Sequence, residues 1–519
     1  MMLLISACVS ALGFSLSLPN EIFLHGFPLG GFLCLAPYFY ALKQAHSRRE
    51  GAVLGFVFGM VFHVSSSWWL ANFKDYALWT LGATSILYGI FYGFWAVLLQ
   101  YAASPDGNAR SGLVSSNGSG SIDGTFSIAL VWTMMEWQKS NGYFAFPWGL
   151  LPYTVQSVPV LIQIADTGGV YGLSFFLALC NAVLTELPRR KFLTLSPDRM
   201  AALLLLVLVL AYGAWRLEKP APVIREIPLV LVQHNIDQYS NDGEALAMAV
   251  DLSRQAAASL RARSREPAII VWSETLLTMP YKGNRFYRAH PAVPFLEQSS
   301  IPVLTGAPLV LIDGPEIANG AILVQNGEII AAYGKQQLIP FAETIPFGEK
   351  KWMRDLMEKF AGFSSGWSAG REAVIMEIPG LRFGTPICFE DAFAGLCRKF
   401  VKNGAELLIN LTNDSWSLSA SAQIQHLAAA RFRAIENRRS LVRSTNSGCT
   451  AVIDAQGRTI ACLPMFTADY LAADVPVQCG SPTVYFLLGD WFPLLCALMF
   501  FGQLIWRQQK RTCLDKRNN

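Results

Sequence analysis

The sequence carries little charge for its length, and no segment of it alternates basic with aromatic residues. Only 15% of its 519 residues are charged, 52% are hydrophobic, and the formal net charge is +4. Nucleic-acid-binding domains concentrate Lys and Arg on one face, so this composition argues against a nucleic acid as partner. The same balance is too apolar for an ordinary soluble enzyme and too charged for a chain made only of spanning helices. We therefore expect a membrane part joined to a water-exposed part.

The ten cysteines form no metal-binding pattern. None belongs to a Cys-x-x-Cys pair, and the spacings typical of zinc ligands are missing. Several cysteines lie in apolar runs, where Cys behaves as a small hydrophobe. We expect neither a metal ion nor another cofactor. A disulfide among Cys449, Cys462 and Cys479 stays an open alternative if this region lies outside the cytoplasm.

Long apolar runs crowd the first two fifths of the chain, and one more lies near its end. Most approach the roughly 20 residues that a helix needs to cross a bilayer, so we predict a membrane α-helical bundle of about eight spanning helices. The runs cover residues 2–18, 26–44, 51–71, 78–103, 125–138, 165–187, 200–217 and 484–506. The first run lacks a basic N-terminal region, which favours an uncleaved helix over a signal peptide.

Basic residues cluster on one side of this predicted bundle. They follow the second run, separate the sixth from the seventh, and follow the eighth, whereas Lys74 and Lys139 stand alone in the alternate loops. Because cytoplasmic loops are enriched in Lys and Arg, both termini are predicted to be cytoplasmic, and residues 220–482 to lie on the opposite side. The segment 104–124, rich in Ser, Gly and Asn, is expected to be a flexible cytoplasmic connection.

We therefore predict a membrane domain at 1–219, an extramembrane domain at 220–482, and a last spanning helix with a basic tail at 483–519. In the extramembrane domain, short apolar runs alternate with amphipathic segments. Asn326-Gly327, between two apolar runs, predicts a β-hairpin. Strands alternating with helices favour an α/β domain. Further strands are predicted at 227–232, 267–272, 301–311, 381–387, 405–411, 440–444 and 449–453, and helices at 243–263 and 420–437.

Three reactive residues follow predicted strands of this domain. Glu274 comes after Val271-Trp272-Ser273, Lys335 after Tyr333-Gly334, and Cys388 after Pro386-Ile387. Strand ends are where α/β sheets collect catalytic groups. A carboxylate can take a thiol proton, the thiolate can hold an acyl group as a thioester, and an ammonium can stabilise the oxyanion. Taken singly, such a Cys is more often inert and buried, and such a Glu or Lys is more often solvated. The flanking sequence therefore decides between a structural and a catalytic role.

The flanking sequence resembles the nitrilase superfamily, whose catalytic residues come in the order Glu, Lys, Cys. The matching segments are Trp272-Ser273-Glu274, Lys335 with Pro340-Phe341-Ala342-Glu343, Cys388-Phe389-Glu390-Asp391, the stretch from Asn410 to Trp416, and Gln425-His426-Leu427 with Arg431 and Glu436. With the apolar runs, and with Glu136-Trp137 followed by Phe146-Pro147-Trp148-Gly149, the whole chain resembles the apolipoprotein N-acyltransferases. These are bacterial inner-membrane enzymes with an α/β nitrilase-like domain, an αββα sandwich, between the seventh and eighth spanning helices.

The resemblance implies a two-step acyl transfer. Cys388 would accept an acyl chain from a phospholipid, typically phosphatidylethanolamine, and the N-terminal amine of a diacylated apolipoprotein would then attack the thioester. Glu274 would be the base and Lys335 the oxyanion stabiliser, with Glu343 and Glu390 as acidic neighbours that orient them. Four aromatic residues would line the route of the acyl chains: Phe146, Trp148, Phe389 and Trp416. Two alternatives stay open, because Phe146 and Trp148 suit an interfacial aromatic anchor equally well and Trp416 could simply pack. Phe389 departs from the family, in which many members have Tyr at this position.

Two other functions are compatible with parts of this pattern. A membrane-tethered amidase would use the same triad with water as acceptor, but it needs no eight-helix domain. A non-catalytic lipoprotein-binding protein would need no intact triad. We therefore expect a multi-pass enzyme of the bacterial inner membrane, monomeric, with its catalytic domain in the periplasm.

Overall fold

The computed structural model describes the chain to residue 518, apart from residues 74–76, 104–121, 187–196, 238–241, 280–290, 311–315, 341, 346 and 362–365. It contains two compact units. The helical unit comprises Met1–Trp68, Gly82–Glu218 and Leu488–Asn519, and the α/β unit comprises Trp69–Leu81 and Lys219–Leu487. Most of the connection expected at 104–124 lies outside the described residues.

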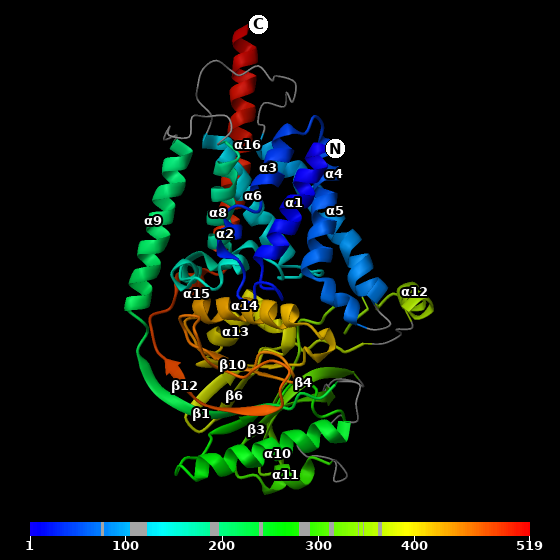
Figure 1. Ribbon diagram of the computed structural model, residues 1–519, viewed down its shortest axis with the longest axis vertical. Helices are drawn as coiled ribbons and strands as arrows, with labels where there is room; N and C mark the ends of the chain where they lie inside the picture. Colours follow the sequence, from blue (N-terminus) through cyan, green and yellow to red (C-terminus); the bar gives the residue numbers. More distant parts are fainter. Residues whose placement is uncertain are drawn as a thin grey trace. The chain divides into compact units, whose positions relative to one another are not determined.

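The helical unit consists of helices of very different length (Figure 1). Among the described residues, three segments are long and apolar enough to cross a membrane: Leu78–Ala103, Ala165–Leu184 and Arg199–Glu218. The last of these exposes Leu203, Leu204 and Leu208, an apolar surface suited to lipid rather than water. The longer helices are α1 (Met2–Ser17), α3 (Ala36–Gln44), α4 (Arg48–Ser66), α5 (Thr84–Ala103), α6 (Ile122–Lys139), α8 (Ala165–Leu184), α9 (Pro197–Glu218) and α16 (Trp491–Asn518).

Two predicted spans are not continuous helices, so these two predictions were wrong. The run at 26–44 is split into the short α2 (Pro28–Gly31) and α3. Prolines in the first turn of both helices favour new helix starts over one continuous helix. The run at 484–506 begins as α15 (Val484–Leu488) and restarts as α16, because Gly489 adopts a φ of +66° and ends the first helix.

The α/β unit is built on two six-stranded sheets. Their strand orders are β12-β1-β2-β3-β4-β5 and β11-β10-β9-β8-β7-β6. The strands are β1 (Val223–Gln233), β2 (Ile269–Val271), β3 (Val303–Val310), β4 (Ile317–Gln325), β5 (Glu328–Gly334), β6 (Ile375–Ile378), β7 (Leu381–Gly384), β8 (Leu407–Thr412), β9 (Leu441–Thr445), β10 (Ala451–Ile453), β11 (Thr459–Cys462) and β12 (Asp469–Gln478).

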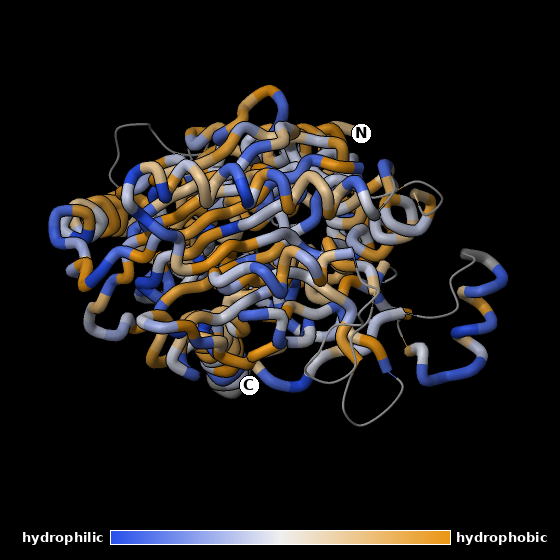
Figure 2. Tube along the Cα trace, turned by 90° about the horizontal axis from the view of Figure 1, so that it is seen from below, coloured by the Kyte–Doolittle hydropathy of each residue, from blue (hydrophilic) through white to orange (hydrophobic). Residues whose placement is uncertain are grey.

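Helices cover the outer face of each sheet. On the first sheet lie α10 (Asp242–Arg261) and α11 (Val293–Gln298), and their apolar residues share one core with β1 to β4. On the second lie α13 (Ala394–Lys402) and α14 (Ala420–Asn437), while α12 (Lys351–Ala361) is a separate short helix. Figure 1 shows this layering, and in Figure 2 hydrophobic segments run through the strands. The predicted α/β sandwich is confirmed.

Short-range signals produced several of these elements directly. The β4–β5 hairpin turns at Asn326 and Gly327, both with positive φ, as a tight Asn-Gly turn requires. The strands β1, β2 and β3 run parallel, and so do β7, β8 and β9, which explains why their cores read as continuous apolar runs. The carboxyl ends of parallel strands lie at the same edge of their sheet. Glu274 follows the end of β2 at this edge of the first sheet, and Cys388 follows the end of β7 at this edge of the second.

Gly306 of β3 allows this close approach of backbone segments. A Cβ atom at this position would lie 2.2 Å from the Thr275 nitrogen and 2.7 Å from the Glu274 backbone. We expect Gly306→Ala to displace the segment that carries Glu274 and to destabilise the fold by about 1–3 kcal/mol, the usual cost of overpacking. Thermal unfolding of the purified protein measures this.

Gly395→Ala is the matched control, because a Cβ there meets no atom within 4 Å and the residue lies in α13. Alanine is favoured over glycine in a helix by about 1 kcal/mol, so this variant should be at least as stable as the parent. Equal unfolding temperatures for the two variants would contradict the role given to Gly306.

Candidate active site

A buried ion-pair cluster joins the ends of β2 and β5. Lys335, directly after β5, places its Nζ 3.2 Å from Glu274 Oε1 and 2.7 Å from Glu343 Oε1. The lysine side chain is fully buried. Asn319 of β4 donates from Nδ2 to the same two carboxylates, at 2.8 Å and 3.1 Å. An ammonium between two carboxylates is fixed in place, because each partner would be costly to bury alone.

Backbone N–H groups hold the second oxygen of each carboxylate. The Asn413 N–H donates to Glu274 Oε2, and the Ile339 N–H donates to Glu343 Oε2, each at 2.9 Å. Glu274 is thus oriented by three separate groups when Asn319 and Lys335 are included. Asn319 was not among the predicted site residues. The signal available for it was a polar side chain within the mostly apolar strand Ile317–Gln325.

Cys388 begins the turn η6 (Cys388–Ala392) that follows β7. Its φ is +52°, in the left-handed region that residues with a side chain seldom adopt. Such strain persists only where the surroundings enforce it, and it is typical of functional positions. Cys388 is 6% exposed, and its thiol lies close enough to Glu274 for the two groups to shift each other's pKa. The structure therefore brings Glu274, Lys335 and Cys388 together.

Burial sets the protonation states of this cluster. Burial, reinforced by Glu274, raises the pKa of the Cys388 thiol well above 9.0, so the thiol is neutral at physiological pH. Burial also raises the pKa of Glu274, although Lys335 opposes that rise. For Lys335 burial acts in the opposite sense, but the two carboxylates outweigh it and raise its pKa. A neutral thiol beside a carboxylate and a permanent cation is arranged for proton transfer at the moment of attack.

Glu390 lies next to this cluster without contacting Glu274. Its carboxylate accepts from Tyr333 Oη at 2.9 Å, from the Gln336 N–H at 2.6 Å and from the Ile387 N–H at 2.8 Å. These bonds tie the end of β5, which carries Lys335, to the turn that carries Cys388. Burial raises the pKa of Glu390 to about 7, and the backbone donors work against that rise.

Aromatic side chains flank the segment after β8. The ring of Trp416 lies 5.6 Å from that of Trp69 and 5.2 Å from that of Phe73, and Asn72 Nδ2 donates to the Ser417 carbonyl at 2.6 Å. Phe389, next to Cys388 in the chain, is buried edge-on against Phe393, with ring centroids 5.0 Å apart. The segment at 69–73 comes from the loop between α4 and α5, and no local sequence signal indicated its contact with Trp416.

The other two aromatic residues predicted to bind substrate belong to the helical unit. Phe146 and Trp148 stack on each other with centroids 5.9 Å apart. Phe146 also packs against His63 and Tyr88. These contacts define a local aromatic cluster of that unit, and a role in substrate binding stays a prediction.

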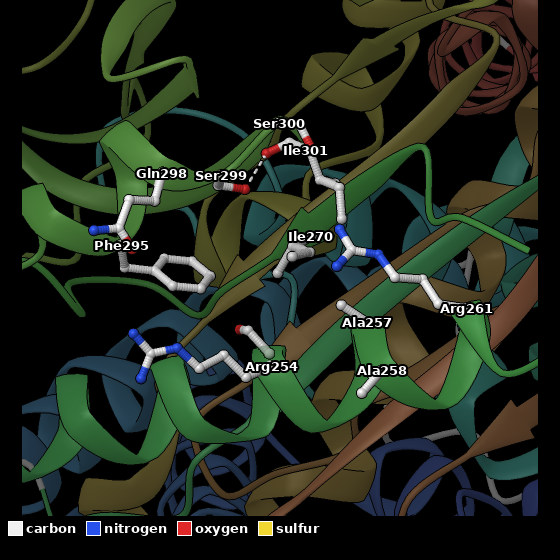
Figure 3. A pocket seen from close by; sticks show the side chains of 11 residues that line it. Arg254, Ala257, Ala258, Arg261, Ile270, Phe295, Gln298, Ser299, Ser300 and Ile301 are labelled. Atoms are coloured by element: carbon white, nitrogen blue, oxygen red, sulfur yellow. Dashed lines mark hydrogen bonds between the residues drawn. The ribbon is translucent and has the colours of Figure 1, made fainter.

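A separate cavity of about 320 Å³ lies between α10 and α11. Figure 3 shows both arginines on the α10 side of this cavity, with Arg254 facing Phe295 and Arg261 pointing toward Ile301. It shares no residue with the Cys388 cluster. Within the described residues, no group of His, Cys, Asp and Glu is placed to hold a metal ion. Cys449, Cys462 and Cys479 are free thiols, so the disulfide left open above is not formed.

Family comparisons cover both units. Residues 10–183 match the apolipoprotein N-acyltransferase N-terminal domain, and residues 231–482 match the carbon-nitrogen hydrolase domain. Among solved structures, Nit3 of Saccharomyces cerevisiae, a member of branch 10 of the nitrilase superfamily, is 16% identical. It aligns with 49% of this chain and 91% of its own, with a TM-score of 0.37.

Relatives that align over nearly their whole length are named apolipoprotein N-acyltransferases. Apolipoprotein N-acyltransferase 2 of Treponema pallidum is 36% identical, with 96% of this chain and 94% of the relative aligned. Its counterpart in Treponema denticola is also 36% identical, with 97% of each chain aligned. Apolipoprotein N-acyltransferase of Borreliella burgdorferi is 30% identical over 95% of this chain and 94% of its own. This chain therefore belongs to the apolipoprotein N-acyltransferase family.

Proposed function

We propose that this protein transfers an acyl chain from a phospholipid to the N-terminal amine of a diacylated apolipoprotein, through a thioester on Cys388. The proposal rests on one observation. The Cys388 thiol interacts with Glu274, and Glu274 forms an ion pair with the buried Lys335. Membership of the family supplies the substrates that fit this cluster. Phosphatidylethanolamine is the donor we propose.

In the first step, Glu274 takes the thiol proton as the Cys388 sulfur attacks the ester carbonyl of the phospholipid. A C–S bond forms, and the carbonyl oxygen becomes an oxyanion that Lys335 stabilises. The ester C–O bond then breaks. Glu274 returns the proton to the leaving alkoxide, so a lysophospholipid departs and the acyl chain stays on sulfur.

In the second step, the N-terminal amine of the apolipoprotein attacks the thioester carbonyl. Glu274 accepts a proton from the amine, Lys335 again stabilises the oxyanion, and the C–S bond breaks. The proton returns to the Cys388 sulfur. The near-complete burial of Cys388 and Lys335 supports transfer over hydrolysis, because water has little access to the intermediate.

A membrane setting supports the same reaction. Extracting acyl chains into water costs about 0.8 kcal/mol per CH₂, so a site that meets its substrates at the bilayer avoids a large penalty. We propose about eight spanning helices, as the apolar runs indicate, in a monomer of the bacterial inner membrane. The domain at 220–482 is then periplasmic, and the segments at 1–219 and 483–519 form the membrane part.

We further propose that Trp416, Phe389 and the contacting Trp69 form the apolar wall along which acyl chains reach Cys388. Trp416 follows Asn413, whose N–H binds Glu274, so this wall adjoins the catalytic base. Phe146 and Trp148 are assigned to acyl-chain binding in the helical unit. Glu343 and Glu390 are assigned to orienting Lys335 and the Cys388 turn.

Exposure to phospholipid tests the thioester. The wild-type protein should gain one acyl mass on Cys388 that hydroxylamine removes, and Cys388→Ala should gain none and transfer nothing to a diacylglyceryl peptide. Intact-protein and peptide mass spectrometry measure both. Cys449→Ala, a buried cysteine of the same unit, is the matched control and should behave as wild type. Hydrolysis of small amides without peptide acylation would point to the amidase, and full activity of Cys388→Ala to a non-catalytic protein.

Glu343→Gln tests the charge cluster. Glu274 must be ionised to act, so the wild-type rate falls as pH drops through its raised pKa. Removing the nearby negative charge of Glu343 lowers the pKa of Glu274, which moves the acid limb of the rate profile to lower pH. The maximal rate should fall by about 10- to 100-fold because Lys335 loses a positioning partner.

The exposed Glu349 provides the control for that experiment. Glu349→Gln should retain the wild-type rate and profile. An acid limb of Glu343→Gln that coincides with the wild-type limb would rule out the electrostatic coupling, whatever the maximal rate.

Trp69→Ala tests the apolar wall. Removing the indole takes away packing area for an acyl chain, so transfer from long-chain donors should slow more than transfer from short-chain donors. The ratio of kcat/KM for the two donors measures this, and the short-chain donor is the internal control. An equal loss for both donors would assign Trp69 to folding rather than to chain binding.

A further inference from the structure

A second buried charge cluster lies on the other side of Cys388. His426 of α14 places Nδ1 2.7 Å from Asp414 Oδ2 and Nε2 2.9 Å from Asp391 Oδ1. Arg443 of β9 binds Asp391 and lies 3.7 Å from Asp414. All four side chains are at least nine-tenths buried.

The geometry fixes a proton on this histidine. Nδ1 is hydrogen-bonded with Asp414 Oδ2, and Nε2 faces the Cys388 carbonyl oxygen, with Asp391 Oδ1 within ion-pair distance. All of these oxygens only accept hydrogen bonds, so both nitrogens must donate, and only an imidazolium has two N–H donors. A neutral ring would leave one acceptor oxygen facing a nitrogen lone pair in a buried site, which is strongly unfavourable.

Charge balance supports the same protonation state. Asp391 and Asp414 carry two negative charges, and Arg443 carries one positive charge. With His426 protonated, the cluster is neutral, whereas with a neutral ring it would bury one uncompensated negative charge. Burial and Arg443 lower the pKa of His426, but Asp414 and Asp391 outweigh them and raise it from 6.5 to about 9. Burial alone would raise the pKa of Asp414, yet His426 and Arg443 bring it below its ordinary value.

The cluster contacts the nucleophile in two ways. His426 Nε2 lies 3.3 Å from the Cys388 carbonyl oxygen, which also accepts from Asn410 Nδ2 at 3.0 Å. These contacts hold the peptide of the one residue in the turn with a φ of +52°. In addition, the Asp414 charge reaches the thiol and raises the pKa of Cys388.

We propose that Asp391, Asp414 and Arg443 keep His426 as a permanent imidazolium, and that this neutral cluster positions the Cys388 nucleophile. His426 is a positioning residue, since it contacts the backbone of Cys388 rather than the substrate. The inference deepens the proposed function, because it concerns the same nucleophile. Its main test uses a small electrophile, so it does not depend on the lipid reaction.

His426→Gln removes the positive charge and keeps a donor near the Cys388 carbonyl. The probe is the rate of Cys388 alkylation by iodoacetamide across pH, followed at that residue by peptide mass spectrometry. We expect the midpoint of alkylation to rise by about one pH unit, because the Asp414 charge is no longer balanced near the thiol. Thioester formation from phospholipid should slow by about tenfold, the rate equivalent of one such unit.

A second substitution separates charge from packing. In His426→Gln with Asp414→Asn, the remaining Asp391 and Arg443 charges cancel, so the alkylation midpoint should return to the wild-type value. A merely structural histidine predicts no such recovery. His234→Gln is the matched control, since His234 is also buried in the α/β unit but burial lowers its pKa to about 4. Its alkylation profile should equal that of the wild type.

One measurement needs no variant and holds even if these substitutions impair folding. Nitrogen NMR of protein labelled in its six histidines should show one ring with both nitrogens protonated at neutral pH. Because the folded pKa is raised, the contribution of His426 to thermal stability is complete below pH 6.5 and is lost as pH rises through about 9. A neutral His426, or single and double variants with the same alkylation midpoint, would overturn the proposal. Loss of acyl transfer with these results intact would instead refute only the lipid reaction.

Discussion

A buried ammonium between two carboxylates is the constraint on which the rest of the site depends. Lys335 is excluded from water, so its charge is tolerated only while Glu274 and Glu343 lie within ion-pair distance. Those carboxylates come from the end of β2 and from the loop after β5, and Asn319 of β4 bonds to both. The charge cluster can form only when β2, β4 and β5 lie in the same sheet with their present order. In turn, the ion pairs stabilise this arrangement of the strand ends.

The sequence predicted the parts of this arrangement that local chemistry determines. Asn326 and Gly327 supply the positive φ values of a tight turn, so the hairpin before Lys335 could be predicted from two residues. The helix at 420–437 was placed with the boundaries that α14 has, starting after Ser419, whose side chain accepts from the Ala422 N–H. Glu274, Lys335 and Cys388 were each expected after a strand, and the structure places them there. Their distances could not follow from local pattern.

Long-range pairing produced the features that the sequence did not predict. Strand β12 pairs with β1 from the far end of the domain, and the short apolar run at 469–478 gives no sign of its partner. Trp69 and Phe73 come between α4 and α5 in the chain, yet they belong to the α/β unit and contact Trp416 there. The span at 26–44 was misjudged for a different reason. Its total hydropathy fits one helix, but proline near its middle favours two.

The Lys335 cluster and the His426 cluster act on different parts of Cys388, the first on its thiol and the second on its backbone. Glu274 and Glu343 exceed Lys335 by one negative charge, which helps keep the thiol protonated, whereas the cluster around His426 is neutral and acts on the backbone. A resting thiolate would be nucleophilic toward any small electrophile that entered the site. A thiol that loses its proton only to Glu274 during attack reacts when an acyl carbonyl is already positioned beside Lys335. The left-handed turn at Cys388 is then useful only if it is rigid, and the contacts of its carbonyl with Asn410 and His426 supply that rigidity. In the proposed reaction, Cys388 is thus fixed in position before its sulfur is charged.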